Sequence, residues 1–120
     1  MKKVLIVDDA KFIRTVYKTK FNSAGIDVEL AEDGETAFGK AKETKPDAVL
    51  LDVIMPKKDG FEVLKEFQAD EELKKIPVIV FSNLSQQDDI DKVLELGAKK
   101  YLPKDNSMPN QIVEEINKFL

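Results

Sequence analysis

Hydrophobic and polar positions divide the chain into short apolar runs and longer stretches with helical spacing. The runs, rich in Val, Ile and Leu, predict strands at residues 4–7, 28–31, 48–51, 78–81 and 98–102. The first, third and fourth runs are unbroken, which is typical of strands covered on both faces. The second and fifth are more polar, which favours positions at the two edges of a sheet.

Between these runs, apolar residues recur every three or four positions, the spacing of one helix face. The expected faces are Phe12, Ile13, Val16, Tyr17 and Phe21; Ala37, Phe38 and Ala41; Phe61, Val63, Leu64 and Phe67; Ile90, Val93 and Leu94; and Ile112, Val113, Ile116 and Phe119. Asp59 and Ser85 each precede an acidic residue by three positions, which predicts a helix start at both. Gly25 and Gly97 stand where helices are expected to end.

Strands that alternate with helices along the whole chain predict crossover connections and a parallel sheet. We expect an α/β fold, a doubly wound five-stranded sheet with helices on both faces, as one domain over residues 1–120 with no output domain. This pattern leaves the order of the strands open. Ligands of such sheets bind beyond the carboxyl ends of the strands, so the residues that follow each strand are the first candidates for function.

The composition excludes several kinds of chemistry. The chain has no His and no Cys, which excludes thiolate and imidazole zinc sites and nucleophiles that depend on either residue. A metal ion would then be a hard cation bound by oxygen. The net charge is −4 with no basic run, which disfavours nucleic-acid binding. The apolar stretch after the first three residues is too short for a leader or membrane span, so a cytoplasmic protein is expected.

Candidate functional side chains follow the first, third, fourth and fifth predicted strands: Asp8 and Asp9, then Asp52, Ser82 and Lys104. Taken singly, each acid or hydroxyl is an ordinary turn or cap residue and Lys104 an ordinary solvated lysine. Likewise "MPKKDG", residues 55–60, is by itself a Pro/Gly turn. The carboxyl ends of parallel strands share one edge, however, so all five side chains are expected to converge.

Three carboxylates, a hydroxyl and an ammonium make a chemically coherent site. The carboxylates repel one another and call for a cation, and Mg²⁺ prefers oxygen ligands and bridges to phosphate oxygens. One carboxylate is then suited to attack phosphorus and form an aspartyl-phosphate. The lysine and the hydroxyl would stabilise charge on the transferred group. No phosphate-binding "GxxxxGK[ST]" loop occurs, which disfavours a nucleotide-binding protein.

At this point the segments "VLIVDDA", "AVLLDVIMPKKDG", "PVIVFS" and "GAKKYLPK" closely resemble response-regulator receiver domains, the phosphoacceptor modules of two-component signalling. The resemblance covers essentially the whole chain and extends to single-domain chemotaxis regulators. It implies a flavodoxin-like fold with strand order 2-1-3-4-5. It also implies a signalling module that catalyses only its own phosphorylation and dephosphorylation.

Residue by residue, the resemblance implies that Asp52 is the phosphorylated aspartate and Lys104 the cation of the site. Asp9 would bind Mg²⁺ directly, Asp8 through water, and Ile54 through its backbone carbonyl. The phosphoryl group would come from a sensor histidine kinase or a histidine phosphotransfer protein. The downstream target protein is left open.

The resemblance also implies a switch. Ser82 would turn toward the phosphoryl group, and Tyr101 would change from an outward to an inward rotamer. The face formed by the fourth helix, the fifth strand and the fifth helix would then differ between two pre-existing states. Taken alone, Tyr101 is expected to be a half-buried aromatic of an edge strand.

The sequence departs from the family pattern at several positions. Asp105 replaces a usual Pro, which puts the cis bond common there in doubt. Asn83 replaces a small residue and would either narrow access to the phosphoryl group or hydrogen-bond to it. Lys58 stands where an apolar residue is common, and Ala10 where a polar one is.

The resemblance also implies that two aliphatic residues, Ile54 and Leu84, flank the phosphoryl group. They would hinder an attacking water, so we expect slow decay of the phosphorylated state.

Two other classes of protein stay open. A hydrolase with an aspartate nucleophile tends to place its second acid two residues later, where this chain has Ile54. A pseudo-receiver would bind partners without phosphorylation, and the local departures at Asn83 and Asp105 are its main support.

Overall fold

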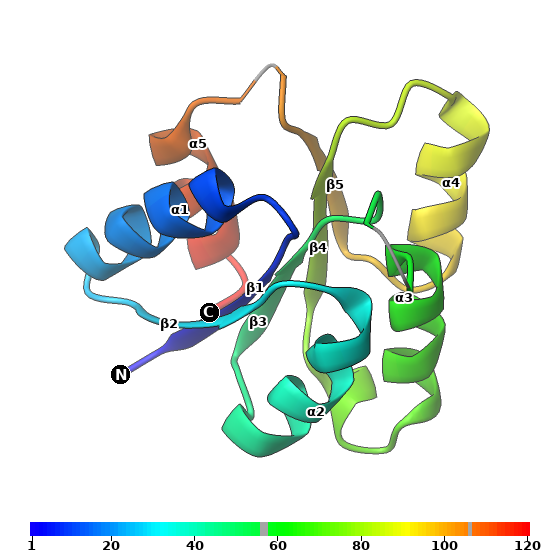
Figure 1. The fold of residues 1–120 in the computed structure, drawn as a ribbon, viewed down its shortest axis with the longest axis horizontal. Coiled ribbons are helices and arrows are strands. Elements are labelled where there is room, and N and C mark those ends of the chain that lie inside the picture. The colour runs from blue at the N-terminus through cyan, green and yellow to red at the C-terminus, as the bar shows by residue number, and fades with distance from the viewer. Residues whose placement is uncertain (56–57, 106) are drawn as a thin grey trace.

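A parallel five-stranded sheet forms the centre of the molecule (Figure 1). The computed structural model describes residues 1–55, 58–105 and 107–120. The strands are β1 (Lys3–Val7), β2 (Asp27–Ala31), β3 (Ala48–Leu51), β4 (Val78–Ser82) and β5 (Lys100–Pro103). Their order is β2-β1-β3-β4-β5. The predicted fold and strand order are confirmed, and the two more polar strands lie at the edges.

Helices cover both faces of the sheet (Figure 1). Within the described ranges they are α1 (Lys11–Ser23), α2 (Gly34–Thr44), α3 (Gly60–Ala69), α4 (Gln87–Glu95), α5 (Pro109–Asn117) and a short 3-10 helix, η1 (Leu73–Lys75). α1 and α5 pack on one face, and α2, α3 and α4 pack on the other. Each of these helices is too short to span a bilayer.

Alternate side chains of the strands enter two separate cores. In β1, Val4 and Ile6 pack with α1 and α5, whereas Leu5 and Val7 pack with α2, α3 and α4. β3 and β4 alternate in the same way and are buried throughout. Because both faces of these strands are covered, their positions are apolar except for Ser82 at the end of β4, and this explains the unbroken runs.

Three of the four predicted helix ends agree with the structure. The Asp59 carboxylate accepts a hydrogen bond from the backbone N–H of Glu62 and caps α3. Gly25 and Gly97 follow α1 and α4 with φ of 79° and 110°, a region that favours glycine. The prediction for Ser85 is wrong: the residue before α4 is Gln86, and its side chain makes no capping hydrogen bond.

Three further predictions need correction. Leu94, expected on the apolar face of the fourth helix, is 43% exposed. Phe12 does not join the apolar face of α1 but is 74% exposed, because it lies at the first turn, beyond the edge of the sheet. The fifth strand begins at Lys100 and not at Ala98. The Ala98 N–H donates to the carbonyl of Val93, so Ala98 belongs to the end of α4 rather than to the sheet.

The register of the strands brings the predicted site residues together. Val7 pairs with Leu51, which places Asp8 and Asp52 side by side just beyond β1 and β3. Ser82 pairs with Pro103, so Lys104 follows immediately on the neighbouring strand. From β1 the chain adds β2 on one side of the sheet and β3 on the other, so the strand order reverses between β1 and β3. Doubly wound sheets bind ligands at this position.

The loop after β3 is closed by a tight contact. The Gly60 N–H donates to the carbonyl of Val53, and a Cβ at Gly60 would lie only 2.4 Å from the Val53 Cα. Only glycine fits this approach, which joins the start of α3 to the residue after Asp52. Pro56 and Lys57 of the predicted "MPKKDG" turn lie outside the described residues.

Candidate functional site

Three carboxylates converge at the carboxyl edge of the sheet. Asp8 and Asp52 are 2% and 5% exposed, and Asp9 is exposed. One oxygen of each lies within 4.8 Å of the others. Two buried carboxylates and a third at their entrance repel one another strongly, so the arrangement requires compensating positive charge.

Backbone amides orient the two buried carboxylates. The N–H of Ala10 donates to Asp8 Oδ1 over 2.9 Å, and the N–H of Ile54 donates to Asp52 Oδ1 over 3.0 Å. Each carboxylate therefore closes a turn two residues long, the ordinary structural role expected for it. This role uses the Oδ1 atoms, and both Oδ2 atoms are directed to a shared cation.

That cation is Lys104. Its Nζ lies 2.7 Å from Asp8 Oδ2 and 3.1 Å from Asp52 Oδ2. It also lies 5.7 Å from the centre of the Phe81 ring, at the limit of a cation–π contact. Lys104 is therefore not the solvated lysine that it would be taken for alone, but a bridge between the two buried acids.

Burial and pairing act in opposite directions on the ionisation of this pair. Burial raises the pKa of the Asp8 carboxyl above its ordinary value, although Lys104 and the Ala10 N–H oppose this. Burial alone would lower the pKa of Lys104, but the hydrogen bond to Asp8 and the charges of Asp52 and Asp8 outweigh it and raise that pKa. Lys104 therefore stays protonated and can pair with an anionic group in the cavity.

Ser82 and Tyr101 link this cluster to the loop after β4. The Ser82 hydroxyl donates to Asp52 Oδ1 over 2.6 Å and is fully buried. The Tyr101 hydroxyl, on half-buried β5, donates to the Ser82 carbonyl over 3.0 Å and accepts from the Leu84 N–H over 2.9 Å. The half-buried edge position expected for Tyr101 is confirmed, and its ring is directed toward the loop.

One residue of the site was not anticipated from the sequence. Arg14 donates from Nη1 to the backbone carbonyl of Asp8 over 2.7 Å and lies 3.9 Å from Glu32. It thereby attaches the first turns of α1 to the strand end that carries the acid pair. The sequence carries no signal for this contact, because it depends on the conformation of the Arg14 side chain.

The departures from the family pattern have structural partners. Lys58 forms a 2.8 Å ion pair with Glu66 of α3. Asn83 accepts a hydrogen bond from the Asp105 N–H over 3.0 Å. The peptide bond between Lys104 and Asp105 is trans, as are the others between described residues. Ala10 contributes its backbone N–H, so its side chain is not needed for that contact.

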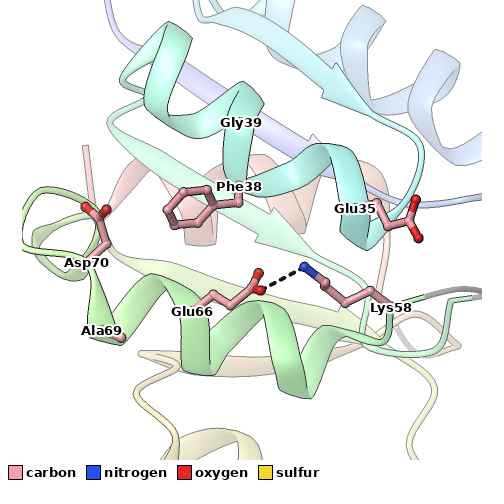
Figure 2. Close-up of a pocket in the computed structure, with 7 residues that line it drawn as sticks. All are labelled: Glu35, Phe38, Gly39, Lys58, Glu66, Ala69 and Asp70. Atoms are coloured by element: carbon pink, nitrogen blue, oxygen red, sulfur yellow. Dashed lines mark hydrogen bonds and ion pairs between the residues drawn. The ribbon is translucent and has the colours of Figure 1, made fainter.

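Two cavities are candidate sites for the chemistry. A cleft of about 400 Å³ between α2 and α3 is lined by Phe38 and the Lys58–Glu66 pair (Figure 2). The cavity over Asp52 is smaller, about 180 Å³, and is lined by Asp52, Ile54, Ser82, Asn83 and Lys104. We assign the chemistry to the smaller one, because the carboxylates, the bridging ammonium and the hydroxyl converge there.

The donor atoms of this cluster suit a hard divalent cation. Carboxylate oxygens are available from Asp8, Asp9 and Asp52, and one Lys104 ammonium leaves an excess of negative charge. Mg²⁺ binds one or two carboxylates and retains several waters, which fits an exposed Asp9 beside two buried acids. The residues present therefore fit a magnesium ion.

The fold is flavodoxin-like, and the acidic cluster lies at the carboxyl edge of its sheet. Consistently, the family model described as "Response regulator receiver domain" matches residues 4–117. The chain belongs to this family. Receiver domains are signalling domains rather than metabolic enzymes, and they interact with histidine kinases and downstream effectors.

Known relatives support this assignment over nearly the full chain. The chain is 39% identical to the chemotaxis protein CheY of Thermotoga maritima, covering 98% of this chain and 96% of that protein. It is 37% identical to the transcriptional regulatory protein PhoP of Bacillus subtilis, covering 99% of this chain and 48% of that protein. The chain thus spans about half the length of the latter relative. The solved structure of CheY4 from Vibrio cholerae superposes with a TM-score of 0.92 at 30% identity, covering 100% of this chain and 99% of that one.

Proposed function

We propose that residues 1–120 form one receiver domain in which Asp52 accepts a phosphoryl group. The observation that carries the proposal is the double contact on this buried carboxylate: Ser82 donates to Oδ1, and Lys104 pairs with Oδ2. Both donors reach Asp52 from neighbouring strands at the sheet edge. They form the set of groups that would stabilise a phosphoryl group attached to this aspartate.

The reaction is a transfer between two side chains. An Asp52 oxygen attacks the phosphorus of a phosphohistidine on a sensor kinase or a histidine phosphotransfer protein. An O–P bond forms, the P–N bond breaks, and its electron pair returns to the imidazole nitrogen. The donors that now hold the carboxylate, Ser82 and Lys104, then serve the new phosphoryl oxygens. Hydrolysis reverses the change when water attacks phosphorus and releases inorganic phosphate.

Mg²⁺ would be held by Asp9, by Asp8 through water, by Asp52, and by the Ile54 backbone carbonyl. When bound, it would neutralise charge on the phosphoryl oxygens. Support comes from the proximity of the three carboxylates and from the turn that ties Ile54 to Asp52. Lys104 pairs with both buried acids and so offsets their mutual repulsion.

The switch would act through Ser82 and Tyr101. Because the Tyr101 hydroxyl binds the backbone on both sides of Asn83, movement of Ser82 toward the phosphoryl group changes what Tyr101 contacts. Phosphorylation adds charge and strong acceptor atoms at this point. The resulting population shift would alter the face formed by α4, β5 and α5, to which the downstream protein binds.

The phosphoryl donor would dock around the cavity. Phe12 at the start of α1, Ile54 after β3 and Met108 before α5 are 74%, 58% and 66% exposed. All three large apolar side chains lie at the carboxyl edge that carries Asp52. An apolar rim around a charged centre is suited to a partner that must exclude water from the transfer.

The test is the intact mass of the protein after incubation with acetyl phosphate and Mg²⁺, with Asp52→Asn as the control. We expect one phosphoryl adduct that requires Mg²⁺ and is absent from the control. An adduct that persists in Asp52→Asn would place the acceptor elsewhere. No adduct on folded protein would favour the pseudo-receiver, and sustained hydrolysis of phosphate esters would favour the hydrolase.

A further inference from the structure

Consecutive residues of two loops are joined at the edge of the cavity. The N–H of Lys104 donates to the backbone carbonyl of Ser82 over 3.1 Å and extends the β4–β5 ladder by one bond. The next N–H, that of Asp105, donates over 3.0 Å to the side chain of Asn83. An amide side chain thus continues the ladder beyond the point where the two strands separate.

This contact explains two departures from the family pattern together. Proline has no backbone N–H, so a chain with Pro at position 105 has no donor for an acceptor at position 83. Here Asp105 supplies the N–H and Asn83 supplies the oxygen. Because the donor is an N–H, the amide oxygen must be the atom that faces it, and this fixes the orientation of the Asn83 side chain.

The contact lies next to the catalytic cation. Lys104 directly precedes Asp105, and its Nζ bridges Asp8 and Asp52 at 2.7 and 3.1 Å. Asn83 directly follows Ser82, whose hydroxyl lies 2.6 Å from Asp52. The hydrogen bond therefore joins the two backbone segments from which the two donors to Asp52 emerge.

We propose that Asn83 is a positioning residue that holds the Lys104–Asp105 segment against the loop after β4 and so keeps Lys104 and Ser82 together on Asp52. This rests on the proposed function, since its effect is on phosphorylation at Asp52. Asn83 acts through Lys104 rather than on the phosphoryl group. Losing one exposed hydrogen bond of this kind predicts a roughly two- to tenfold slower transfer.

The experiment compares Asn83→Ala with Asn83→Leu in the rate of adduct formation from acetyl phosphate and Mg²⁺. Leucine has the same number and branching of side-chain heavy atoms as asparagine but no acceptor, whereas alanine removes both the bulk and the acceptor. We expect both variants to be slower than the wild type, by similar factors. A faster Asn83→Ala with an unchanged Asn83→Leu would show that Asn83 only obstructs the cavity and would overturn the proposal.

A second arm tests whether the effect passes through Lys104. In a Lys104→Ala background, Asn83→Leu should slow adduct formation no further. A full additional loss there would overturn the proposal. Thermal unfolding of each variant identifies any that fail to fold.

A third arm needs no activity. Hydrogen exchange of the Asp105 amide should be roughly two- to tenfold faster in Asn83→Leu than in the wild type. Equal exchange would show that the bond is not maintained in solution and would overturn the proposal. If the wild type forms no adduct at Asp52, the proposed function fails, whereas a normal adduct that is insensitive to Asn83 defeats this inference alone.

Discussion

The Tyr101 hydroxyl accepts a hydrogen bond from the backbone N–H of Leu84, with the two atoms 2.9 Å apart. The same hydroxyl donates to the Ser82 carbonyl, so one side chain of β5 binds the loop after β4 at two points. These two bonds are made by a single polar atom at the tip of an aromatic ring. Removing this atom therefore releases the loop without creating a large cavity.

We expect Tyr101→Phe to increase hydrogen exchange of the Leu84 amide by about fivefold, which corresponds to about 1 kcal/mol for the lost bond. The ring stays, so the β4–β5 ladder should be unchanged, and amides such as that of Lys99 should exchange as before. The measurement is amide exchange followed by NMR in the unphosphorylated protein. Unaltered exchange at Leu84 would contradict the hydrogen bond between the Leu84 N–H and the Tyr101 hydroxyl.

The fold was largely predictable because burial on both faces imposes a strong pattern. Val4 to Val7 must be apolar for two opposed cores, and the acid that follows marks the point where both cores end. Helix ends were less predictable. Ser85 has the right residue type and spacing for a cap, yet α4 begins after Gln86, because local spacing does not report how the preceding loop is held.

The residues of the site could be predicted from the sequence, but the hydrogen bonds that position them could not. That Asp8, Asp52, Ser82 and Lys104 converge follows from their positions after parallel strands. That Arg14 binds the Asp8 carbonyl depends on a side-chain conformation across a loop, which no periodicity encodes. The same holds for the hydrogen bond to Asn83, since its donor is a backbone N–H far away in the sequence.

The buried Asp8 carboxyl makes the stability of the protein dependent on pH. Its pKa is raised by burial above the ordinary 3.8, so the folded protein binds this proton more tightly than the unfolded chain does. The contribution of Asp8 to the free energy of unfolding is therefore fully present below pH 3.8. It is lost as the pH rises through the raised pKa.

We expect Asp8→Asn to be more stable than the wild type at pH 7 without divalent cations, and this advantage should shrink toward pH 3.5. Urea unfolding of both proteins in EDTA, at pH values between these limits, measures the difference. Acids far from Asp8 contribute equally in both proteins and cancel. A wild type that is the more stable at pH 7 would show that the Lys104 pair outweighs burial. Added Mg²⁺ should stabilise the wild type more, because the variant lacks one negative charge of the proposed metal site.

The lifetime of the phosphorylated state should depend on Ile54 more than on Leu84. Ile54 is 58% exposed at the cavity, whereas Leu84 is only partly exposed and packs against the core on the α2, α3 and α4 face. Ile54→Asn replaces a hydrocarbon barrier with a group that can hydrogen-bond to water. We expect dephosphorylation about tenfold faster, corresponding to about 1.4 kcal/mol in the barrier.

The decay is measured by intact mass after removal of acetyl phosphate. Leu84→Glu should add a smaller increase in the double variant, and its folding is checked separately because Leu84 contacts the core. A decay rate that is unchanged or lower in the double variant would contradict the protective role of these aliphatic residues.

Docking of the phosphoryl donor should depend on the exposed apolar rim. Phe12 lies in the first turn of α1 and Met108 directly precedes α5, so both lie at the carboxyl edge of the sheet, and neither lines the cavity over Asp52. We expect Phe12→Ala and Met108→Ala each to lower kcat/KM for transfer from a phosphorylated kinase by about tenfold, the loss typical of a residue central to an interface. Phosphorylation by acetyl phosphate should change less than about twofold, because that donor is too small to contact the rim.

Leu94→Ala is the matched control. Leu94 is 43% exposed on α4, so it offers a comparable apolar surface away from the carboxyl edge of the sheet. Transfer from the kinase should be unaffected by this change. If Leu94→Ala slows transfer as much as Phe12→Ala does, the donor docks on the α4 face instead. If Phe12→Ala slows both the kinase and acetyl phosphate equally, Phe12 supports the geometry of the acid pair after β1 and takes no part in docking.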